Sequence, residues 1–414
     1  MKAIRSTLPA AALLALAACA DAPTASSAAD AAPLLAAQSG RGIDGQYIVV
    51  LQSGTDPRSV AAVAGVQPRF VYTAAVNGFS AALNEGQLNA LRHLPGVEYV
   101  EQDGVAEAWT TQSPVTWGLD RIDQRSLPLS NSYTYTATAP GVYAYVIDTG
   151  IQADHPQFGT RAASAYDALG GTGADCNGHG THVAGTAAGS TYGVAKNATV
   201  ISVRVLPCAG TGGAWSDVIA GVDWVKLNHV KPAVANMSLS GGANTAADQA
   251  VANSIAAGVT YVVAAGNDNA NACSYSPARV ANALTVGATT SSDARSSFSN
   301  YGTCLDLVAP GSGITSAWYT SSTAINTIDG TSMASPHVAG VVALYLQNNT
   351  TATPATVVSA ILNSAFANKL TGIGTGSPNR LLNSLLATPP QPLKVTVDCM
   401  YANTYPYGST NDCT

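Results

Sequence analysis

Gly330-Thr-Ser-Met-Ala-Ser-Pro-His-Val-Ala-Gly340 places an exposed serine, Ser332, at the start of an apolar helix. A hydroxyl is a weak nucleophile until a neighbouring base takes its proton, so this segment needs a histidine and an orienting carboxylate from elsewhere. Without those partners, the same residues would be no more than a capped helix start. The function of this segment therefore depends on whether the chain supplies both partners.

Both partners are present. Asn177-Gly-His-Gly-Thr-His-Val-Ala-Gly185 carries His179 at a glycine-rich helix entry, and Val146-Ile-Asp-Thr-Gly150 carries Asp148 at the end of an apolar strand. The order along the chain is Asp, His, Ser. Each segment alone has a structural explanation, such as a turn residue after a strand, but the three together predict nucleophilic catalysis.

The chain after residue 140 alternates strands with helices. Continuously apolar strands separated by helices indicate a parallel sheet covered on both faces. In such a sheet, the chemistry gathers at the carboxyl ends of the strands, where Asp148 and Asn267 fall. We expect strands at 142–147, 200–206, 234–239, 261–265, 284–286 and 305–308, and helices at 216–228 and 246–257, the second ended by Gly258.

The region before residue 110 has a different pattern. Residues 47–51 read as a strand, 60–66 as a helix, 69–83 as a hairpin turning at Asn77-Gly78, 87–94 as a helix and 97–100 as a strand. This βαββαβ order predicts a small α+β domain, an open sheet with two helices on one face.

The three segments around Asp148, His179 and Ser332, in that order, resemble those of the subtilisin family of serine proteases. Segments 117–124 (Trp-Gly-Leu-Asp-Arg-Ile-Asp-Gln), 274–279 (Ser-Tyr-Ser-Pro-Ala-Arg) and 297–302 (Ser-Phe-Ser-Asn-Tyr-Gly) are similar to the proteinase K branch, and specifically to aqualysin-type enzymes. The resemblance covers residues 110–387. It implies a doubly wound, mostly parallel α/β sheet with helices on both faces, and a secreted, self-processing serine endopeptidase.

Residues 45–109 resemble the matching inhibitor propeptide, which templates folding of the protease and blocks its cleft until it is removed. A catalytically silent binding or inhibitor protein on the same fold is the alternative, because a fold does not guarantee activity. The complete set of catalytic residue types argues against it. A serine esterase would show a Gly-x-Ser-x-Gly elbow and the order Ser, Asp, His, which this chain lacks.

The resemblance also gives each residue a role. Ser332 would be the nucleophile, His179 the base and Asp148 the group that orients it, while Asn267 would donate to the oxyanion together with the backbone N–H of Ser332. A zinc site at Cys176, His179 and His182 is the competing interpretation of that segment, but no fourth nitrogen or sulfur ligand lies near.

Two segments resemble cleft edges that pair with an extended substrate: Gly210-Thr-Gly212-Gly213 and Ser238-Leu239-Ser240-Gly241. Glycines let a peptide backbone approach closely, and main-chain pairing explains broad specificity. The first specificity pocket would lie between Ser238–Gly241 and Ala264-Ala265-Gly266. Neither wall contains an acid, so we expect a large apolar or aromatic P1 residue rather than Lys or Arg.

Structural calcium is the implied cofactor, since oxygen ligands suit a hard cation. The ligands would be Asp306 with the carbonyls of Ala281 and Ala283 at one site, and Asp120, Asp123, Gln124, Ser130 and Ser132 at the other. Taken alone, Asp120 and Asp123 read as solvated acids at a helix start.

The amino terminus reads as an export signal. A basic start and the apolar run Leu8–Ala18 predict a secretory signal over residues 1–19. Leu16-Ala-Ala-Cys19 resembles a lipoprotein signal, with ordinary cleavage after Ala18 or Ala20 as the alternative. Residues 20–44 have the composition of a disordered linker. Alignment of Thr110-Thr-Gln-Ser-Pro114 with mature aqualysin-type enzymes predicts self-cleavage between Trp109 and Thr110, which would free the enzyme from any lipid on Cys19.

Six further cysteines in an exported chain predict three disulfides, for which sequence alone permits fifteen pairings. The resemblance implies Cys176 with Cys208 and Cys273 with Cys304, leaving Cys399 with Cys413. The last pair lies in residues 388–414, a proline-rich linker and short tail that would act as a packing flap by default, with a binding role as the alternative.

The charge composition limits the possible partners. Only 10% of residues are charged, against roughly 25% in an average soluble domain. The net charge is −6 and lysines and arginines do not cluster, which argues against nucleic acid as a partner. We expect protein and peptide substrates, the chain's own propeptide as inhibitor, and a monomeric mature enzyme.

Overall fold

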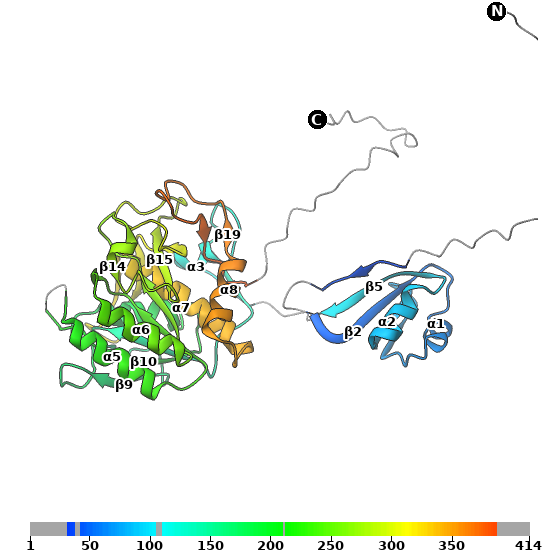
Figure 1. Cartoon of the computed structure of the whole chain (residues 1–414), viewed down its shortest axis with the longest axis horizontal. Helices are drawn as coiled ribbons and strands as arrows, with labels where there is room; N and C mark the ends of the chain where they lie inside the picture. Colours follow the sequence, from blue (N-terminus) through cyan, green and yellow to red (C-terminus); the bar gives the residue numbers. More distant parts are fainter. Residues whose placement is uncertain (1–30, 38–41, 105–109, 210–211, 387–414) are drawn as a thin grey trace, which may run out of the picture. The chain divides into compact units, whose positions relative to one another are not determined.

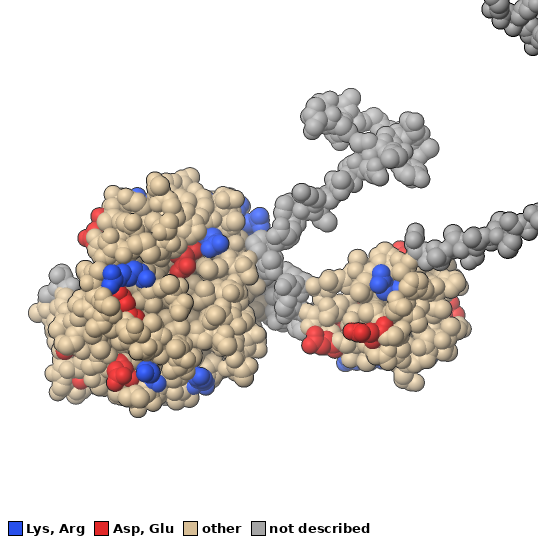
Figure 2. Space-filling model, in the orientation of Figure 1, with Lys and Arg blue, Asp and Glu red and all other residues tan. Residues whose placement is uncertain are grey.

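The computed structural model describes residues 31–37, 42–104, 110–209 and 212–386. These residues form two compact units, one before and one after residues 105–109 in the sequence (Figure 1). On the face shown in Figure 2, charged side chains are sparse, and most of the surface of both units carries neither sign.

The first unit is a five-stranded sheet with two helices. The strand order is β1-β5-β2-β4-β3, and β2 runs antiparallel to both β4 and β5. Alternate strand residues such as Val49, Phe79 and Val100 share one core with residues of both helices, so the helices cover one face of the sheet. The elements are β1 (Leu34–Leu35), β2 (Gly42–Leu51), α1 (Pro57–Val63), β3 (Phe70–Tyr72), β4 (Gly78–Ala82), α2 (Glu85–Arg92) and β5 (Val97–Gly104).

The expectation of a disordered linker over residues 20–44 is wrong for its last part. Leu34 and Leu35 form β1, which runs parallel to β5, and Ala32 is only 8% exposed. Ala32 also exchanges two hydrogen bonds with Arg92, through its own N–H and its carbonyl. A two-residue strand shows no periodicity in the sequence, and it forms because the edge of β5 offers unpaired backbone groups.

The second unit is built on a nine-stranded sheet in the order β19-β20-β16-β15-β13-β11-β8-β10-β9. Every pair is parallel except β19–β20. The strands are β8 (Tyr143–Asp148), β9 (Ala162–Asp167), β10 (Thr199–Arg204), β11 (Ala233–Met237), β13 (Thr260–Ala264), β15 (Leu284–Thr289), β16 (Leu307–Pro310), β19 (Phe366–Ala367) and β20 (Arg380–Leu381).

Helices cover both faces of this sheet, as expected for a doubly wound α/β fold. Val146 of β8 belongs to one core with residues of α4, α7 and α8, whereas Ile147, its neighbour, belongs to a second core with residues of α5 and α6. The helices are α3 (Trp117–Ile122), α4 (His179–Ala188), α5 (Trp215–Asn228), α6 (Thr245–Ala256), α7 (Thr331–Asn348) and α8 (Pro354–Ser364). Gly258, at φ +104°, follows the end of α6.

Short antiparallel pairs complete the unit. They are β6 (Thr110–Gln112) with β7 (Tyr133–Tyr135), β12 (Gly241–Gly242) with β14 (Tyr275–Ser276), and β17 (Ile314–Ala317) with β18 (Ile325–Ile328). Sequence reasoning missed these pairs and β9, because small and polar residues give such short, half-exposed strands no apolar run. All expected main strands of the sheet are present, with ends that differ by a few residues.

Candidate active site

The proposed nucleophile, Ser332, is the second residue of α7. Its backbone N–H lies in the first turn of the helix, where no intrahelical acceptor exists, so it is available to a ligand. The side chain rests on the neighbouring strand end: Ser332 Oγ donates to the carbonyl of Ser238 at 3.0 Å. The helix start and the end of β11 therefore meet at the serine.

The proposed base and its orienting acid come from adjacent elements at the same edge of the sheet. His179 is the first residue of α4, and Asp148, fully buried, is the last residue of β8. His179 Nδ1 lies 2.7 Å from Asp148 Oδ1, which also accepts from the N–H of Thr149 at 2.8 Å. Because Asp148 occupies Nδ1, Nε2 is the nitrogen left to accept a proton.

The electrostatics of His179 are set by opposing effects. Burial of the ring lowers its pKa, but the charge and hydrogen bond of Asp148, with a further contribution from Asp175, outweigh burial, so the pKa of His179 is raised above its ordinary value. The side chain keeps 26% exposure. Asp148 thus stabilises the imidazolium form, which is the form a general base passes through.

His179, Ser332 and Asn267 line one cavity of about 620 Å³. Seven of the expected substrate-binding residues also line it, whereas Ala265 and Gly266 do not, and Gly210 lies outside the described residues. The expected residues in the lining are Gly212, Gly213, Ser238, Leu239, Ser240, Gly241 and Ala264. Sequence reasoning missed Thr149, Asn177, Leu206, Pro207, Trp215, Val218, Asp329 and Thr331.

The amide of Asn267 is oriented by Thr331. The backbone N–H and the hydroxyl of Thr331 both donate to Asn267 Oδ1, at 2.9 Å and 2.8 Å, and the same hydroxyl accepts from Gly266 N–H at 3.1 Å. With its oxygen engaged, the amide presents its NH₂ group as a donor. Asn267 and the N–H of Ser332 are therefore two donors at one cavity, the pattern of an oxyanion hole.

A buried polar network lies beneath the nucleophile. Ser238 Oγ accepts from Asn236 Nδ2 at 2.8 Å, donates to the carbonyl of Ser332 at 2.7 Å, and lies 2.8 Å from Ser335 Oγ. These contacts join β11 to the first turn of α7. They restrain the backbone that carries Ser332, since each bond ties the end of β11 to the helix start.

The wall of the cavity formed by Ser238–Gly241 is shaped by an aromatic ring. A Cβ at Gly241 would lie 2.9 Å from Trp215 Cζ2, so only glycine fits there. Gly241 also pairs with Ser276 in the short β12–β14 ladder. Among the described residues that line the cavity, Asp329 is the one acid, and its Oδ1 accepts from Gly313 N–H at 2.6 Å.

The solvated alternative for Asp120 and Asp123 is wrong. Asp120 is 2% exposed and accepts from the N–H and hydroxyl of Ser130 and from the N–H of Asn131. Asp123 Oδ1 is buried and has no hydrogen-bond partner in the described part of the chain. Burial, with a smaller effect of the nearby Asp120, raises the pKa of Asp123 to about 6.

The other expected calcium ligands are more dispersed. Asp306 Oδ2 accepts from Thr285 N–H at 2.8 Å, and burial raises the pKa of Asp306 to about 6. Ala281 and Ala283 lie on the loop before β15, Ser130 Oγ lies 2.8 Å from Ser132 Oγ, and Gln124 donates to two loop carbonyls. Within the described ranges, no three His, Cys, Asp or Glu side chains come together as a metal-binding group.

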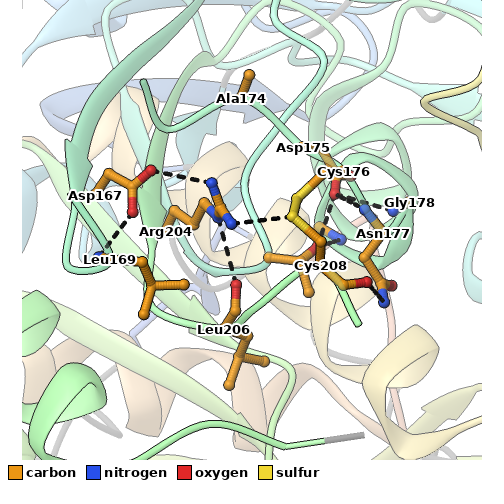
Figure 3. Close-up of a disulfide and its surroundings, with 12 residues drawn as sticks. Asp167, Leu169, Ala174, Asp175, Cys176, Asn177, Gly178, Arg204, Leu206 and Cys208 are labelled. Atoms are coloured by element: carbon orange, nitrogen blue, oxygen red, sulfur yellow. Dashed lines mark hydrogen bonds and ion pairs between the residues drawn. A yellow bond between two sulfur atoms is a disulfide. The ribbon is translucent and has the colours of Figure 1, made fainter. Parts of the chain in front are cut away.

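Two of the expected disulfides are formed: Cys176–Cys208 and Cys273–Cys304. The first ties the loop before α4 to the segment after β10, close to Arg204 and Asp167 (Figure 3). His182 is a buried side chain bonded to the carbonyl of Ile314. Cys399, Cys413 and Cys19 lie outside the described residues.

Comparison with known proteins agrees with this geometry. Residues 140–385 match the model of the "Subtilase family", and residues 61–108 match "Peptidase inhibitor I9". An "Extracellular serine proteinase" of Thermus sp. (strain Rt41A) is 55% identical over 397 residues, covering 89% of this chain and 96% of that protein. The "Alkaline serine exoprotease A" of Vibrio alginolyticus is 53% identical over 77% of this chain and 61% of that protein.

A solved structure gives the same assignment. The "Crystal structure of a cold adapted subtilisin-like serine proteinase" is 56% identical, with a TM-score of 0.64, covering 66% of this chain and 99% of that one. In the described residues we find no helix with both the length and the apolar character to span a membrane. The chain belongs to the subtilase family: it is a subtilisin-like serine endopeptidase preceded, in the same chain, by an I9 inhibitor domain.

Proposed function

We propose that Ser332, His179, Asp148 and Asn267 carry out the peptide hydrolysis of this family. The observation that supports this assignment best is the 2.7 Å contact between His179 Nδ1 and the fully buried carboxylate of Asp148, at the cavity that Ser332 and Asn267 also line. A neutral imidazole held in this tautomer is ready to accept a proton at Nε2.

The reaction follows from these positions. Ser332 Oγ attacks the carbonyl carbon of the scissile bond while its proton passes to His179 Nε2, and Asp148 stabilises the resulting imidazolium. The oxyanion accepts from the Asn267 amide and the Ser332 N–H. The C–N bond then breaks as His179 protonates the leaving amine. Water, deprotonated by His179, attacks the acyl carbon; the bond to Ser332 Oγ then breaks as His179 returns the proton to Oγ, which releases the acid and restores Ser332.

One change of hydrogen-bond partner is needed before attack. In this structure the Ser332 hydroxyl donates to the Ser238 carbonyl, so it has to exchange that acceptor for His179 Nε2. Catalytic hydrogen bonds are often unformed in a free enzyme and tighten in the substrate complex. The cost of this exchange is that of one neutral hydrogen bond, about 1 kcal/mol.

Changing Ser332 to Ala tests the assignment in the full-length chain. The precursor should remain uncleaved when purified alone, and peptide hydrolysis should fall by about 10⁶-fold, the loss known for the subtilisin nucleophile. Mass spectrometry of the purified protein reports the cut. Maturation of the Ser332→Ala chain at the wild-type rate would overturn the proposal.

We propose a preference for large apolar or aromatic P1 side chains. The walls Ser238–Gly241 and Ala264–Gly266 contain no acid, and Asp329, which lines the same cavity, accepts a hydrogen bond from Gly313 N–H. A Lys or Arg side chain would lose its hydration there without gaining a counter-ion. Peptides with Phe, Tyr or Leu at P1 should show much higher kcat/KM than an Arg peptide, and equal values would refute the preference.

We propose that the propeptide is removed by a cut between Trp109 and Thr110. The aromatic P1 residue suits the pocket, and the cut would release the enzyme from any acyl group on Cys19, so that secreted activity and a lipid-modified precursor are compatible. Determining the amino terminus of the active species in cell fractions tests this. Activity that stays in the membrane fraction on a chain beginning at Cys19 would overturn it.

We propose two structural calcium sites, at Asp120, Asp123, Gln124, Ser130 and Ser132, and at Asp306 with the carbonyls of Ala281 and Ala283. The unpartnered, buried Oδ1 of Asp123 beside a second carboxylate supports the first site, because a cation there would satisfy both charges. Bound calcium would supply stability rather than chemistry. Excess chelator should lower the melting temperature of the inhibitor-blocked enzyme, and an unchanged value would exclude both sites.

A further inference from the structure

Asp175 lies four residues before His179, in the loop that leads into α4, and the reaction steps above leave it without a role. We propose that Asp175 is a positioning residue for His179: it holds the first turn of α4 in the geometry that brings the imidazole to Asp148, and it adds negative charge beside that pair. The inference rests on the proposed role of His179 as the base.

The Asp175 carboxylate is nearly buried, since the residue is only 7% exposed, and it accepts five hydrogen bonds from protein groups. Oδ1 accepts from Thr149 Oγ1 at 3.0 Å, Asn177 N–H at 3.0 Å and Gly178 N–H at 2.9 Å. Oδ2 accepts from the N–H of Thr181 at 3.0 Å and from its hydroxyl at 2.5 Å. Figure 3 shows the carboxylate directed at Asn177 and Gly178. Its donors on Asn177, Gly178 and Thr181 thus bracket His179 in sequence.

Helix α4 needs this external acceptor. Its N-cap residue is Gly178, which has no side chain to accept from the first turn. Gly178 has φ +107°, and a Cβ there would lie 2.4 Å from the ring of Trp318, so no Ser, Thr, Asn or Asp can occupy the N-cap. Asp175 replaces the missing cap from three residues upstream, and its negative charge also suits a helix N-terminus.

Thr149 joins Asp175 to Asp148. Its hydroxyl donates to Asp175 Oδ1 and accepts from Gly180 N–H at 2.9 Å, while its own N–H donates to Asp148 Oδ1. The two carboxylates are therefore linked through a single residue at the end of β8. This link connects the position of the helix start to the position of the acid that His179 has to meet.

The charges facing His179 are mostly negative. Asp148 on β8 and Asp175 on the loop before α4 both favour the charged imidazole, and Asp329, before α7, lines the same cavity. His182, one turn along α4, stays neutral because burial lowers its pKa to about 4. No Lys or Arg lines the cavity, and among the described residues none forms an ion pair with Asp175. The charge of Asp175 is therefore not cancelled nearby.

The experiment compares Asp175→Asn with a matched control, Asp167→Asn. Asp167 is also a buried carboxylate near the Cys176–Cys208 disulfide, but it bonds Arg204, Leu169 and Gly173 rather than the start of α4 (Figure 3). Full-length chains are matured with a bead-bound protease, and active sites are counted by titration with a sulfonyl fluoride. The readouts are kcat, KM and the pH midpoint of the acid limb of kcat/KM.

Asp175→Asn should lower kcat by about 10- to 100-fold, the effect of a small misplacement of a catalytic group, with KM unchanged. The acid-limb midpoint should move to lower pH, because a negative charge that favours the imidazolium is lost. Asp167→Asn should lower thermal stability without moving that midpoint. A wild-type kcat and midpoint for Asp175→Asn, or an equal midpoint shift in Asp167→Asn, would overturn the inference.

Thr149→Val provides a second test that keeps the charge. It removes the hydroxyl between Asp175 and Gly180, so kcat should fall while the midpoint stays in place, and an unchanged kcat would overturn the inference even if Asp175→Asn yields no titratable sites. The proposed function has its own test: it would be wrong if the Ser332→Ala variant still hydrolysed peptides. A negative result for Asp175→Asn would overturn only the positioning role of Asp175.

Discussion

At the scale of single residues, the site depends on side chains whose orientation is set by hydrogen bonds from a single neighbouring residue. Asn267 follows β13, but a strand-end asparagine can present either its oxygen or its NH₂ group to the cavity. Thr331 removes this ambiguity with two donors to Oδ1. The residue next to the proposed nucleophile therefore orients the second proposed oxyanion donor, and both donors belong to one local arrangement.

Replacing Asn267 by Ala should lower kcat by about 10²- to 10³-fold, the loss known for an oxyanion-hole amide in subtilisin. KM should change little, because the donor acts on charge that develops only in the transition state. Steady-state kinetics on a Phe peptide measures both constants.

The matched variants are Thr331→Ser, which keeps the hydroxyl donor, and Thr331→Val, which removes it. Thr331→Ser should behave as wild type, and Thr331→Val should lose part of the activity that Asn267→Ala loses. If Asn267→Ala raised KM and left kcat unchanged, the donor role would be wrong.

At the scale of elements, α4, α7 and the end of β8 carry the proposed catalytic groups, and the Cys176–Cys208 disulfide ties the loop before α4 to the segment after β10. Cys176 lies three residues before His179, and Cys208 follows Leu206 and Pro207, which line the cavity. Cys273–Cys304 closes a loop of similar length, with a sequence separation of 31 against 32. Variants that lack one or the other disulfide can therefore be compared directly.

Replacing both cysteines of either pair by Ser should lower the free energy of unfolding by about 3 to 4 kcal/mol in the loop-entropy model. Only the Cys176–Cys208 variant should also lose kcat/KM, because it alone links the base to the cleft wall. Denaturant unfolding of sulfonyl-fluoride-blocked enzyme and peptide kinetics measure the two effects. Equal losses of activity in both variants would show that Cys176–Cys208 contributes no more to catalysis than Cys273–Cys304 does.

At the scale of the whole molecule, stability depends on two buried histidines, His182 of α4 and His337 of α7. Burial lowers the pKa of His182 and of His337 to about 4, so both are neutral in the folded protein at neutral pH. Between pH 6.5 and about 4 the unfolded chain binds protons that the folded chain cannot, so stability falls as the pH falls through this window. The raised pKa values of His179, Asp123 and Asp306 act in the opposite direction.

The contribution of one histidine can be isolated by difference. His337→Gln cannot be protonated, so the gap in unfolding free energy between wild type and variant should change by about 3 kcal/mol from pH 7 to pH 4. Denaturant titrations of the blocked enzyme at several pH values measure it. A gap that is constant with pH would contradict the assignment.

The sequence by itself determined the parts that are encoded locally. The strand-and-helix alternation, the doubly wound sheet and the positions of Asp148, His179, Ser332 and Asn267 could all be read from short segments, because apolar periodicity and turn residues act within a few positions of the chain. The parallel sheet then explains why residues at strand ends meet at one edge.

The tertiary structure decided what depends on contacts between distant segments. It alone placed β1 on the edge of β5, buried Asp120 and the Oδ1 atom of Asp123, fixed the direction of the Asn267 amide and gave Asp175 its five donors. A two-residue strand has no period, and an aspartate before a helix reads the same whether it is solvated or enclosed. Such differences arise only when packing removes water and leaves each polar group to the partners that the fold supplies.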